Sequence, residues 1–312
     1  PAAGQHHSKA PYWRLLRFYM FSTLLNIVVP VFAVVAVGFA FGRRQHHADM
    51  GFINLANVAV FCPALVFSAL IDNPVRLGTS WPLMLAGVLV IVLPGLLLCL
   101  FRFKGLERRT LALGGMFRNT GNIGIPLMML AYGEDQLGAI IILFVLSNLI
   151  HFSLGLFILS REAGRWLWLK NPIIWSAVLG ILLADHRALL PEFVYTSTGL
   201  LGQMAVPLML FALGVRLSGG EMGDLGLALR VDLSYLLVGA ASLLLVAWWL
   251  PLSDDWLRLL ALSVMLPPAV LNYLLCEQYR CQPDKMASIV LLGNAMSVLT
   301  IPLVIYLTLT LL

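Results

Sequence analysis

Charged residues are scarce in this sequence. Asp, Glu, Lys and Arg make up 11% of its 312 residues, hydrophobic residues make up 60%, and the mean hydropathy is +0.92. Soluble globular proteins carry roughly 25% charged residues, so this composition indicates a membrane protein in contact with a lipid bilayer. The net charge is only +5, and no basic stripe interleaved with aromatic residues is present. A nucleic-acid partner is therefore not expected.

Cysteine and the common catalytic motifs are scarce as well. The four cysteines, Cys62, Cys99, Cys276 and Cys281, are scattered through apolar segments without metal-ligand spacing. We expect them to be small buried side chains, with no metal site and no disulfide. The chain lacks a Gly-x-Ser-x-Gly elbow, a His-Glu-x-x-His pair and a phosphate-binding loop, so neither an enzyme nor a bound cofactor is expected. No small-residue site follows the first apolar segment, which argues against a cleavable signal peptide.

Ten apolar segments are present instead, and most reach the roughly 20 residues needed to cross a membrane. They cover residues 21–42, 51–71, 81–101, 109–132, 136–160, 171–186, 192–215, 228–250, 256–279 and 286–311. Residues 12–20 mix aromatic side chains with arginines. We therefore predict that residues 1–20 form a tail and an interfacial lead-in to the first span.

Lys and Arg gather in alternate loops. The loops after segments 1, 3, 5, 7 and 9 hold 13 of them, whereas the other loops and the amino-terminal tail hold 6. The positive-inside rule then places the first set of loops in the cytoplasm. This predicts a multi-pass protein of the inner (plasma) membrane with both termini on the extracytoplasmic side.

Prolines recur at a nearly constant spacing. The pairs are Pro30 with Pro172 and Pro126 with Pro268, both 142 residues apart, and Pro63 with Pro207, 144 residues apart. Each pair falls in corresponding segments of a five-plus-five division. Because five is odd, the two copies must lie in opposite orientations across the bilayer. The predicted fold is an all-α membrane protein of ten transmembrane helices, arranged as two inverted five-helix repeats over residues 21–160 and 171–312.

The fourth segment contains the most polar stretch inside any predicted span. Its sequence is Arg118-Asn119-Thr120-Gly121-Asn122-Ile123-Gly124-Ile125-Pro126. Glycine and proline weaken a helix, and freed backbone is tolerated at membrane depth only where protein or a water-filled cavity satisfies it. The ninth segment carries a matching interruption at Pro267-Pro268. Helices 4 and 9 are therefore predicted to be broken crossover helices around a midplane binding site, as in secondary transporters.

The candidate substrate-binding residues come from these two interruptions. They are Arg118, Asn119, Gly121, Asn122, Pro126, Pro268 and Asn272. Half-helix amino-termini favour an anionic ligand, and Arg118 could add a planar fork for a carboxylate. Alternatively, Arg118 could pair with carbonyls near one membrane face, and the asparagines could bond neighbouring helices. Asn54 is placed near the membrane edge.

Residues that could couple transport to an ion are harder to find. The fifth segment contains no pair of aspartates and offers Ser147, Asn148 and His151 instead. His151, with Asn148 beside it, is a possible proton or ion site, although a histidine bonded to a neighbouring helix is the other interpretation. Asp232 and Glu277 are placed at the membrane interface. Without a buried carboxylate, proton or sodium exchange is not expected as the main activity.

Several stretches together resemble the auxin efflux carrier family, which includes plant PIN-type carriers and bacterial permeases. They are residues 57–67, 118–127, 203–208 with Leu213-Gly214, 267–269 and 297–303. The resemblance implies two inverted five-helix repeats, crossover helices 4 and 9 broken at proline, and a mobile transport part beside a scaffold. It also implies an organic-anion substrate and a homodimer. The long cytoplasmic loop of many plant members is missing here.

The sequence thus predicts a secondary carrier of a small organic anion that works by elevator-like or rocking alternating access. A sodium-coupled, bile-acid-type symporter of the same fold is the alternative among transporters. A membrane module that senses a ligand without moving it is the alternative from another class.

Overall fold

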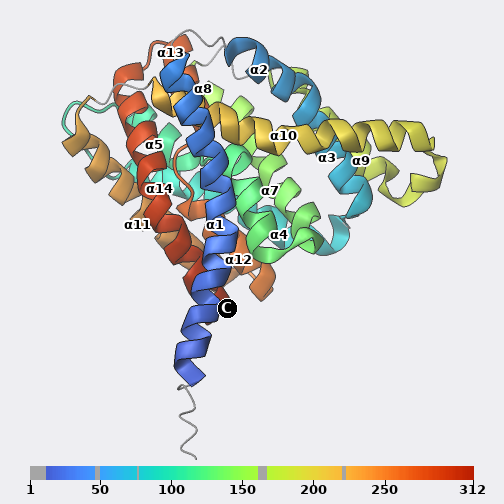
Figure 1. Ribbon diagram of the computed structural model, residues 1–312. Helices are drawn as coiled ribbons and strands as arrows, with labels where there is room; N and C mark the ends of the chain where they lie inside the picture. The colour runs from blue at the N-terminus through green and yellow to red at the C-terminus, as the bar shows by residue number, and fades with distance from the viewer. Residues whose placement is uncertain (1–11, 46–49, 76, 161–166, 220–222) are drawn as a thin grey trace, which may run out of the picture.

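The computed structural model describes residues 12–45, 50–75, 77–160, 167–219 and 223–312. Within these ranges every regular element is helical (Figure 1), and eight helical stretches are long and apolar enough to cross a membrane. The prediction of an all-α, multi-pass membrane protein is confirmed at this level. Tail residues 1–11 and the loop arginines Arg76, Arg161 and Arg165 lie outside the described residues.

The eight stretches coincide with eight of the ten predicted segments. They are formed by α1 (Tyr12–Arg44); α2 (Met50–Ala56), η1 (Asn57–Phe61) and α3 (Cys62–Asp72); α4 (Leu77–Leu98); η3 (Glu134–Gln136), α7 (Leu137–Ile150), η4 (His151–Gly155) and α8 (Leu156–Leu159); α9 (Pro172–Leu183) with η7 (Ala184–Leu189); α10 (Glu192–Ser218); α11 (Leu225–Trp249); and α14 (Pro283–Leu311). A short 3₁₀ turn, η6 (Leu167–Lys170), precedes α9.

The other two predicted segments are interrupted. The fourth consists of α5 (Arg108–Met116), the π-helical turn η2 (Thr120–Gly124) and α6 (Ile125–Tyr132). The ninth consists of α12 (Asp254–Met265) and α13 (Val270–Gln278). These α-helices are only 8 to 12 residues long, short of the roughly 20 that a complete span requires. Each interrupted segment therefore has its two halves joined by non-helical backbone in the interior.

The helices pack as two groups. In the first, which we call the α10 group, α1 lies along α10, and α3 packs against both α9 and α10. In the second, the α11 group, α11 packs against α4, α12 and α14, and α4 packs against α5 and α7. Figure 1 shows α3 and α9 on one side of the molecule and α11 and α14 on the other. The groups meet where α10 contacts η2 and where α7 contacts α3 and α9.

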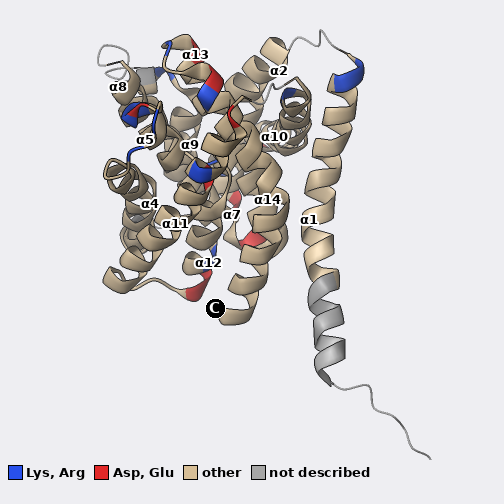
Figure 2. Cartoon of the chain, turned by 90° about the vertical axis from the view of Figure 1, so that its left-hand side faces the viewer, with Lys and Arg blue, Asp and Glu red and all other residues tan. Residues whose placement is uncertain are grey.

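Charged and apolar side chains are distributed as a membrane setting requires. Figure 2 shows Lys and Arg gathered mainly at the end of the molecule where α1 and α13 end, whereas the acidic start of α12 lies at the opposite end. Leu237, Leu244 and Trp248 on α11 are exposed large apolar side chains, which suit contact with lipid.

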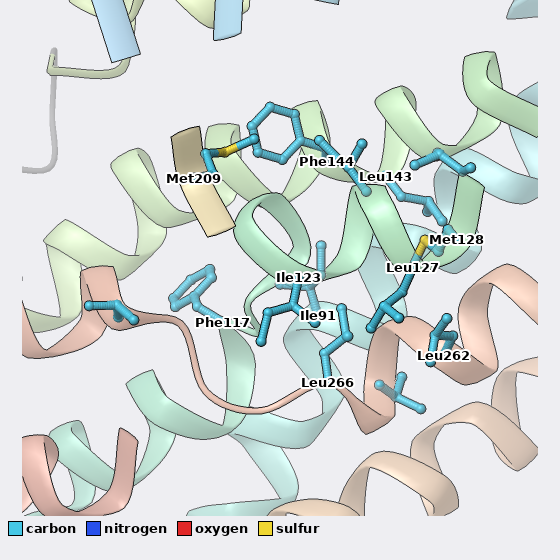
Figure 3. Close-up of a cluster of buried hydrophobic side chains, with 14 of the residues drawn as sticks. Ile91, Phe117, Ile123, Leu127, Met128, Leu143, Phe144, Met209, Leu262 and Leu266 are labelled. Atoms are coloured by element: carbon cyan, nitrogen blue, oxygen red, sulfur yellow. The ribbon is translucent and has the colours of Figure 1, made fainter. Parts of the chain in front are cut away.

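The core surrounds the interruptions. Buried side chains from both interrupted segments, including Phe117, Ile123 and Leu266, pack with Ile91 of α4 and Leu143 of α7 (Figure 3). This apolar packing holds the two interruptions at a defined position in the interior, where they shape the site.

Candidate functional site

The two interruptions cross each other in the interior of the protein. Arg118 and Pro268 form an isolated antiparallel bridge. The Asn119 amide donates to the Pro267 carbonyl at 2.8 Å, and the Ala269 amide donates to the Phe117 carbonyl at 2.9 Å. The second interruption lies at Pro267-Pro268 as predicted, because proline lacks an N–H and forces the residue before it into extended conformations.

The first interruption does not lie where the sequence suggested. It covers the residues between α5 and η2, from Phe117 to Asn119, whereas Pro126 is the second residue of α6 in an intact helical stretch. The prediction that helix 4 breaks at Pro126 is therefore wrong. The π-helical turn η2 ends two residues before Pro126, and its wider spacing accommodates a proline ring that would otherwise clash with the carbonyl four residues back. In the bridge between the two interruptions, Pro268 pairs with Arg118 and not with Pro126.

Every backbone carbonyl of the crossing has a donor. Phe117 O accepts from Ala269 N and from Asn272 Nδ2 (2.9 Å), Arg118 O from Thr120 N, Leu266 O from Arg118 Nη1 (3.5 Å), Pro267 O from Asn119 N, and Pro268 O from Asn294 Nδ2 (3.3 Å). An unsatisfied carbonyl in a membrane interior costs several kcal/mol. Polar side chains at the crossing are therefore needed to satisfy the backbone, whatever else they do.

Arg118 is one of the side chains that donate to backbone carbonyls at the crossing. Its side chain is 7% exposed, and Nη2 donates to the Tyr235 carbonyl of α11 at 2.8 Å. The guanidinium carbon also lies 5.3 Å from the centre of the Tyr235 ring. The structure thus shows the carbonyl-pairing arrangement, one of the two interpretations that the sequence left open. Arg118 links the first interruption to α11.

A cavity of about 190 Å³, which we call the central cavity, lies beside the crossing and between the α10 and α11 groups. Three π-helical turns supply polar side chains to its wall: Asn57 from η1, Thr120 and Asn122 from η2, and His151 from η4. Such turns are rare and occur frequently at functional sites. Further lining residues are Asn54, Arg118, Asn119, Gly121, Phe144, Ser147, Asn148, Met209, Arg216 and Val270.

The structure divides the predicted residues into two sets. Arg118, Asn119, Gly121, Asn122, Asn148 and His151 line the central cavity, whereas Pro126, Pro268 and Asn272 do not. Asn272 is completely buried and donates to Phe117 O, so it joins α13 to the first interruption. Among the described residues the Asn122 side chain has no hydrogen-bond partner, which leaves its amide free for a ligand. Gly121 leaves room for Phe144, because a Cβ there would lie 2.9 Å from the ring.

His151 and Asn148 lie on the α7 side of the cavity. The His151 ring stacks on Phe117 with centroids 3.9 Å apart, and its Nε2 is buried without a partner among the described residues. Asn148 Nδ2 donates to the Phe144 carbonyl of its own helix at 2.9 Å. The wall between the two helix groups is completed by Phe144 and Met209, which lie side by side in Figure 3.

Sequence reasoning placed three polar residues wrongly or missed their role. Asn54 lines the central cavity, a role that the sequence did not suggest, although it lies only four residues after the start of α2 at Met50. Arg216, counted among the loop charges, also lines it, because α10 continues to Ser218. Asp232 is only 4% exposed rather than interfacial, because α11 begins at Leu225 and places it two turns inside. Glu277 is exposed, as expected. More accurate helix ends would have placed Arg216 and Asp232 inside their helices, whereas the sequence carried no signal for the role of Asn54, whose helix start was predicted to within one residue.

The central cavity adjoins a wider opening on one side of the protein. A cavity of about 710 Å³ extends from the end of α1 to the start of α14 and shares Arg216, Val270 and Leu274 with the central cavity. At the opposite end a separate cavity of about 460 Å³ is lined by Asp72 and Asp135 and shares no lining residue with the central cavity. In this conformation the site is therefore closer to the side that carries the basic loops.

Membrane-crossing helices with two crossing interruptions and a polar cavity beside them define a membrane transporter. Residues 23–305 match the family model described as "Membrane transport protein", and the chain belongs to this family. The match confirms the resemblance to auxin efflux carriers, and it identifies a transporter rather than an enzyme. The chain is also 24% identical to a protein of Rhizobium meliloti (strain 1021) named "Putative malonate transporter", over 91% of this chain and 95% of that protein.

The two prolines of the interrupted segments should respond differently to substitution. Pro268→Ala changes the crossing itself, so we expect slower transport with little change in substrate affinity. Pro126→Ala lets η2 revert to a regular α-helical turn, which rotates Asn122 away from the cavity and should weaken binding instead. Substrate binding and flux in the two variants would be compared with Pro302→Ala, a proline inside α14 with no π-helical turn before it. Identical behaviour of Pro126→Ala and Pro268→Ala would contradict this division.

Proposed function

We propose that the protein is a secondary carrier of a small organic anion, with a dicarboxylate as the first substrate to test. The observation that carries this proposal is the position of two helix starts at one cavity. Gly121 and Asn122 in the first turn of η2, and Val270 and Leu271 at the start of α13, all line the central cavity. The first N–H groups of a helix have no intrahelical partner and favour an anion. Arg216 adds a positive charge to the same wall.

The size of the cavity supports a small substrate. Pockets for drug-sized ligands measure roughly 300–1,000 Å³, whereas the central cavity measures about 190 Å³. A three- or four-carbon dicarboxylate suits this volume better than a bile acid does. The name of the relative from Rhizobium meliloti (strain 1021) also points to a dicarboxylate, malonate.

The two helix groups support alternating access. Both interrupted segments pack with the α11 group, since α13 contacts α14 and α6 contacts α7. We therefore propose that this group moves against the α10 group and carries the crossing with it, in an elevator-like or rocking motion. The underlying arrangement would be two inverted five-helix repeats, residues 21–160 and 171–312. Local symmetry favours this arrangement, because Asn122 and Asn272 each lie four residues beyond the bridged Arg118 and Pro268.

The membrane setting is part of the same proposal. With the basic loops in the cytoplasm, the protein would sit in the inner membrane with both termini outside, and the conformation seen here would face inward. The homodimer implied by the family resemblance stays a prediction, as does a coupling role for His151 and Asn148.

Uptake of labelled malonate into proteoliposomes tests the proposed function. We expect saturable uptake that other dicarboxylates compete with and that taurocholate does not. Binding without any flux would instead support a sensor, and uptake that requires sodium and accepts bile acids would support the alternative symporter. Absence of both binding and flux across a panel of mono-, di- and tricarboxylates would overturn the organic-anion assignment.

Asn122 should be the asparagine that matters most for affinity. A hydrogen bond to a charged ligand group is worth roughly 1.5–3 kcal/mol, so Asn122→Ala should weaken dicarboxylate binding about tenfold or more. The control is Asn73→Ala at the end of α3, where the side chain bonds Ala69 O and lies outside the central cavity. Isothermal titration calorimetry in detergent measures both. Equal and small effects would remove Asn122 from the substrate site.

A further inference from the structure

A buried acid lies behind the crossing, on the side away from the central cavity. Asp232 of α11 is 4% exposed, and both of its carboxyl oxygens are buried without a hydrogen-bond partner among the described residues. It lines a cavity of about 10 Å³ together with Arg118, Pro267, Pro268 and Gly293. Gly293 of α14 lets Asp232 and Pro268 approach this helix closely, because a Cβ at Gly293 would lie 3.0 Å from Asp232 Oδ1 and 2.7 Å from the Pro268 ring.

Few charged or titratable groups face this carboxyl. Within the described residues, Arg118 faces it from the first interruption and Tyr235 faces it from α11 itself. The elements packed against α11 contribute no other: α4 has no titratable side chain, the arginines of α5 are exposed at its start, the charges of α12 lie in its first five residues, and α14 presents Gly293, Met296 and Thr300. Arg118 lies between the two cavities, because it lines both.

An isolated carboxylate is too costly in such a place. Ionisable groups inside a membrane protein are expensive, and they mark ion or proton pathways. A metal cation would need several oxygen ligands, but the remaining wall is mostly apolar, with Leu236, Met265 and Met296. A volume of about 10 Å³ is at the lower limit for a single water molecule. The neighbouring guanidinium also repels a metal cation. These features favour a proton.

We infer that Asp232 is the proton-binding site that couples substrate movement to a proton gradient. This inference rests on the proposed carrier function and extends it to the coupling ion. When the carrier is loaded, a proton forms an O–H bond on Asp232, and the substrate occupies the central cavity. Because Asp232 and the crossing belong to the same helix group, proton and anion cross together, and the O–H bond breaks on the other side to release the proton.

Arg118 connects the two sites. With Asp232 neutral, the Arg118 guanidinium donates to the carbonyls of Tyr235 and Leu266, as in the structure. After Asp232 loses its proton, its carboxylate attracts the Arg118 guanidinium. The positive charge of the guanidinium then compensates the negative charge of the carboxylate in the empty carrier. As the guanidinium turns toward Asp232, its hydrogen bonds to the carbonyls of Tyr235 and Leu266 weaken. Because these bonds hold the first interruption against α11, the protonation of Asp232 and the geometry of the crossing are linked.

The test uses the full-length protein in proteoliposomes with labelled malonate and an acidic exterior. The parent should accumulate malonate above the equilibrium level. Asp232→Asn, which mimics the protonated acid, should lose this accumulation while still exchanging labelled for unlabelled malonate. Glu277→Gln, which removes an exposed acid on α13, should accumulate malonate like the parent. Accumulation by Asp232→Asn at the parent level would overturn the inference.

A second measurement uses only the parent protein, so it does not depend on whether the Asp232→Asn variant folds. The membrane potential is clamped with potassium and valinomycin, and a dye inside the vesicles reports their internal pH. Malonate entry into vesicles with the parent protein should lower this internal pH. Replacing sodium by choline should leave both the malonate flux and the pH change unaltered. Malonate flux without dye response shows that transport is uncoupled from protons, and flux abolished in choline shows a sodium site. Either result overturns the proton site but leaves the carrier function intact, whereas no flux at all would count against the carrier function.

Discussion

Arg118→Gln should abolish most transport while leaving substrate affinity close to that of the parent protein. The guanidinium donates to Tyr235 O and Leu266 O and faces α11, so its loss removes the donors that fix the first interruption. Hydrogen bonds from a charged group are worth roughly 1.5–3 kcal/mol each, and part of that loss is offset because a buried charge is removed as well. We expect lower thermal stability and flux reduced by at least one order of magnitude.

Two further variants complete this experiment: Arg118→Lys as the conservative substitution and Arg230→Gln as the surface control. Lysine keeps the charge but loses the planar fork, so it should retain more flux than glutamine and less than the parent. Arg230→Gln is the matched control, since Arg230 is exposed on the same α11 and its side chain bonds only Gly226 O among the described residues. A fall in affinity as large as the fall in flux would show that Arg118 binds the substrate carboxylate directly.

Arg216→Gln should have the opposite signature, a large loss of affinity. Arg216 is the cation of α10 that lines the central cavity, and its side chain is only partly buried. Removing a charge-assisted hydrogen bond of roughly 1.5–3 kcal/mol corresponds to about a tenfold or larger rise in the dissociation constant. Because the site is partly open to the 710 Å³ cavity, added salt should weaken dicarboxylate binding in the parent more than in the variant.

Arg43→Gln provides the comparison for Arg216. Arg43 lies at the end of α1 and lines the wider opening, but it does not line the central cavity. The same loss of charge at this position should change affinity only slightly, since exposed charges are screened by solvent and salt. Calorimetric titration with malonate at low and high salt measures both variants. Indistinguishable dissociation constants would remove Arg216 from the substrate site.

The two results together would separate binding from movement. Arg216 belongs to the α10 group and Arg118 to the α11 group, and the central cavity lies between them. A carrier whose moving group carries the crossing needs Arg118 to keep that group intact during the step. It needs Arg216 only while the substrate is held against the α10 group.

The sequence by itself determined the membrane class and the position of the helices. Low charge and apolar runs of spanning length suffice for this, because the bilayer imposes a length that can be counted along the chain. The interruption at Pro267-Pro268 was also determined locally, since the missing N–H groups act on their own helix. The motif from Arg118 to Asn122 could be recognised because such polarity inside a span requires a partner.

Only the tertiary structure decided which of these polar residues face the cavity. Arg118 and Asn272 satisfy carbonyls at the crossing, Asn122 is free, and Pro126 follows a π-helical turn rather than a break. Arg216 and Asp232 were misplaced because an error of three residues at a helix end moves a side chain from the surface to the interior. The role of Asn54 was missed because the central cavity extends to the first turns of α2. Whether a polar side chain satisfies the backbone or meets a ligand depends on carbonyls contributed by a distant segment. No local pattern in the sequence records which distant segment that is.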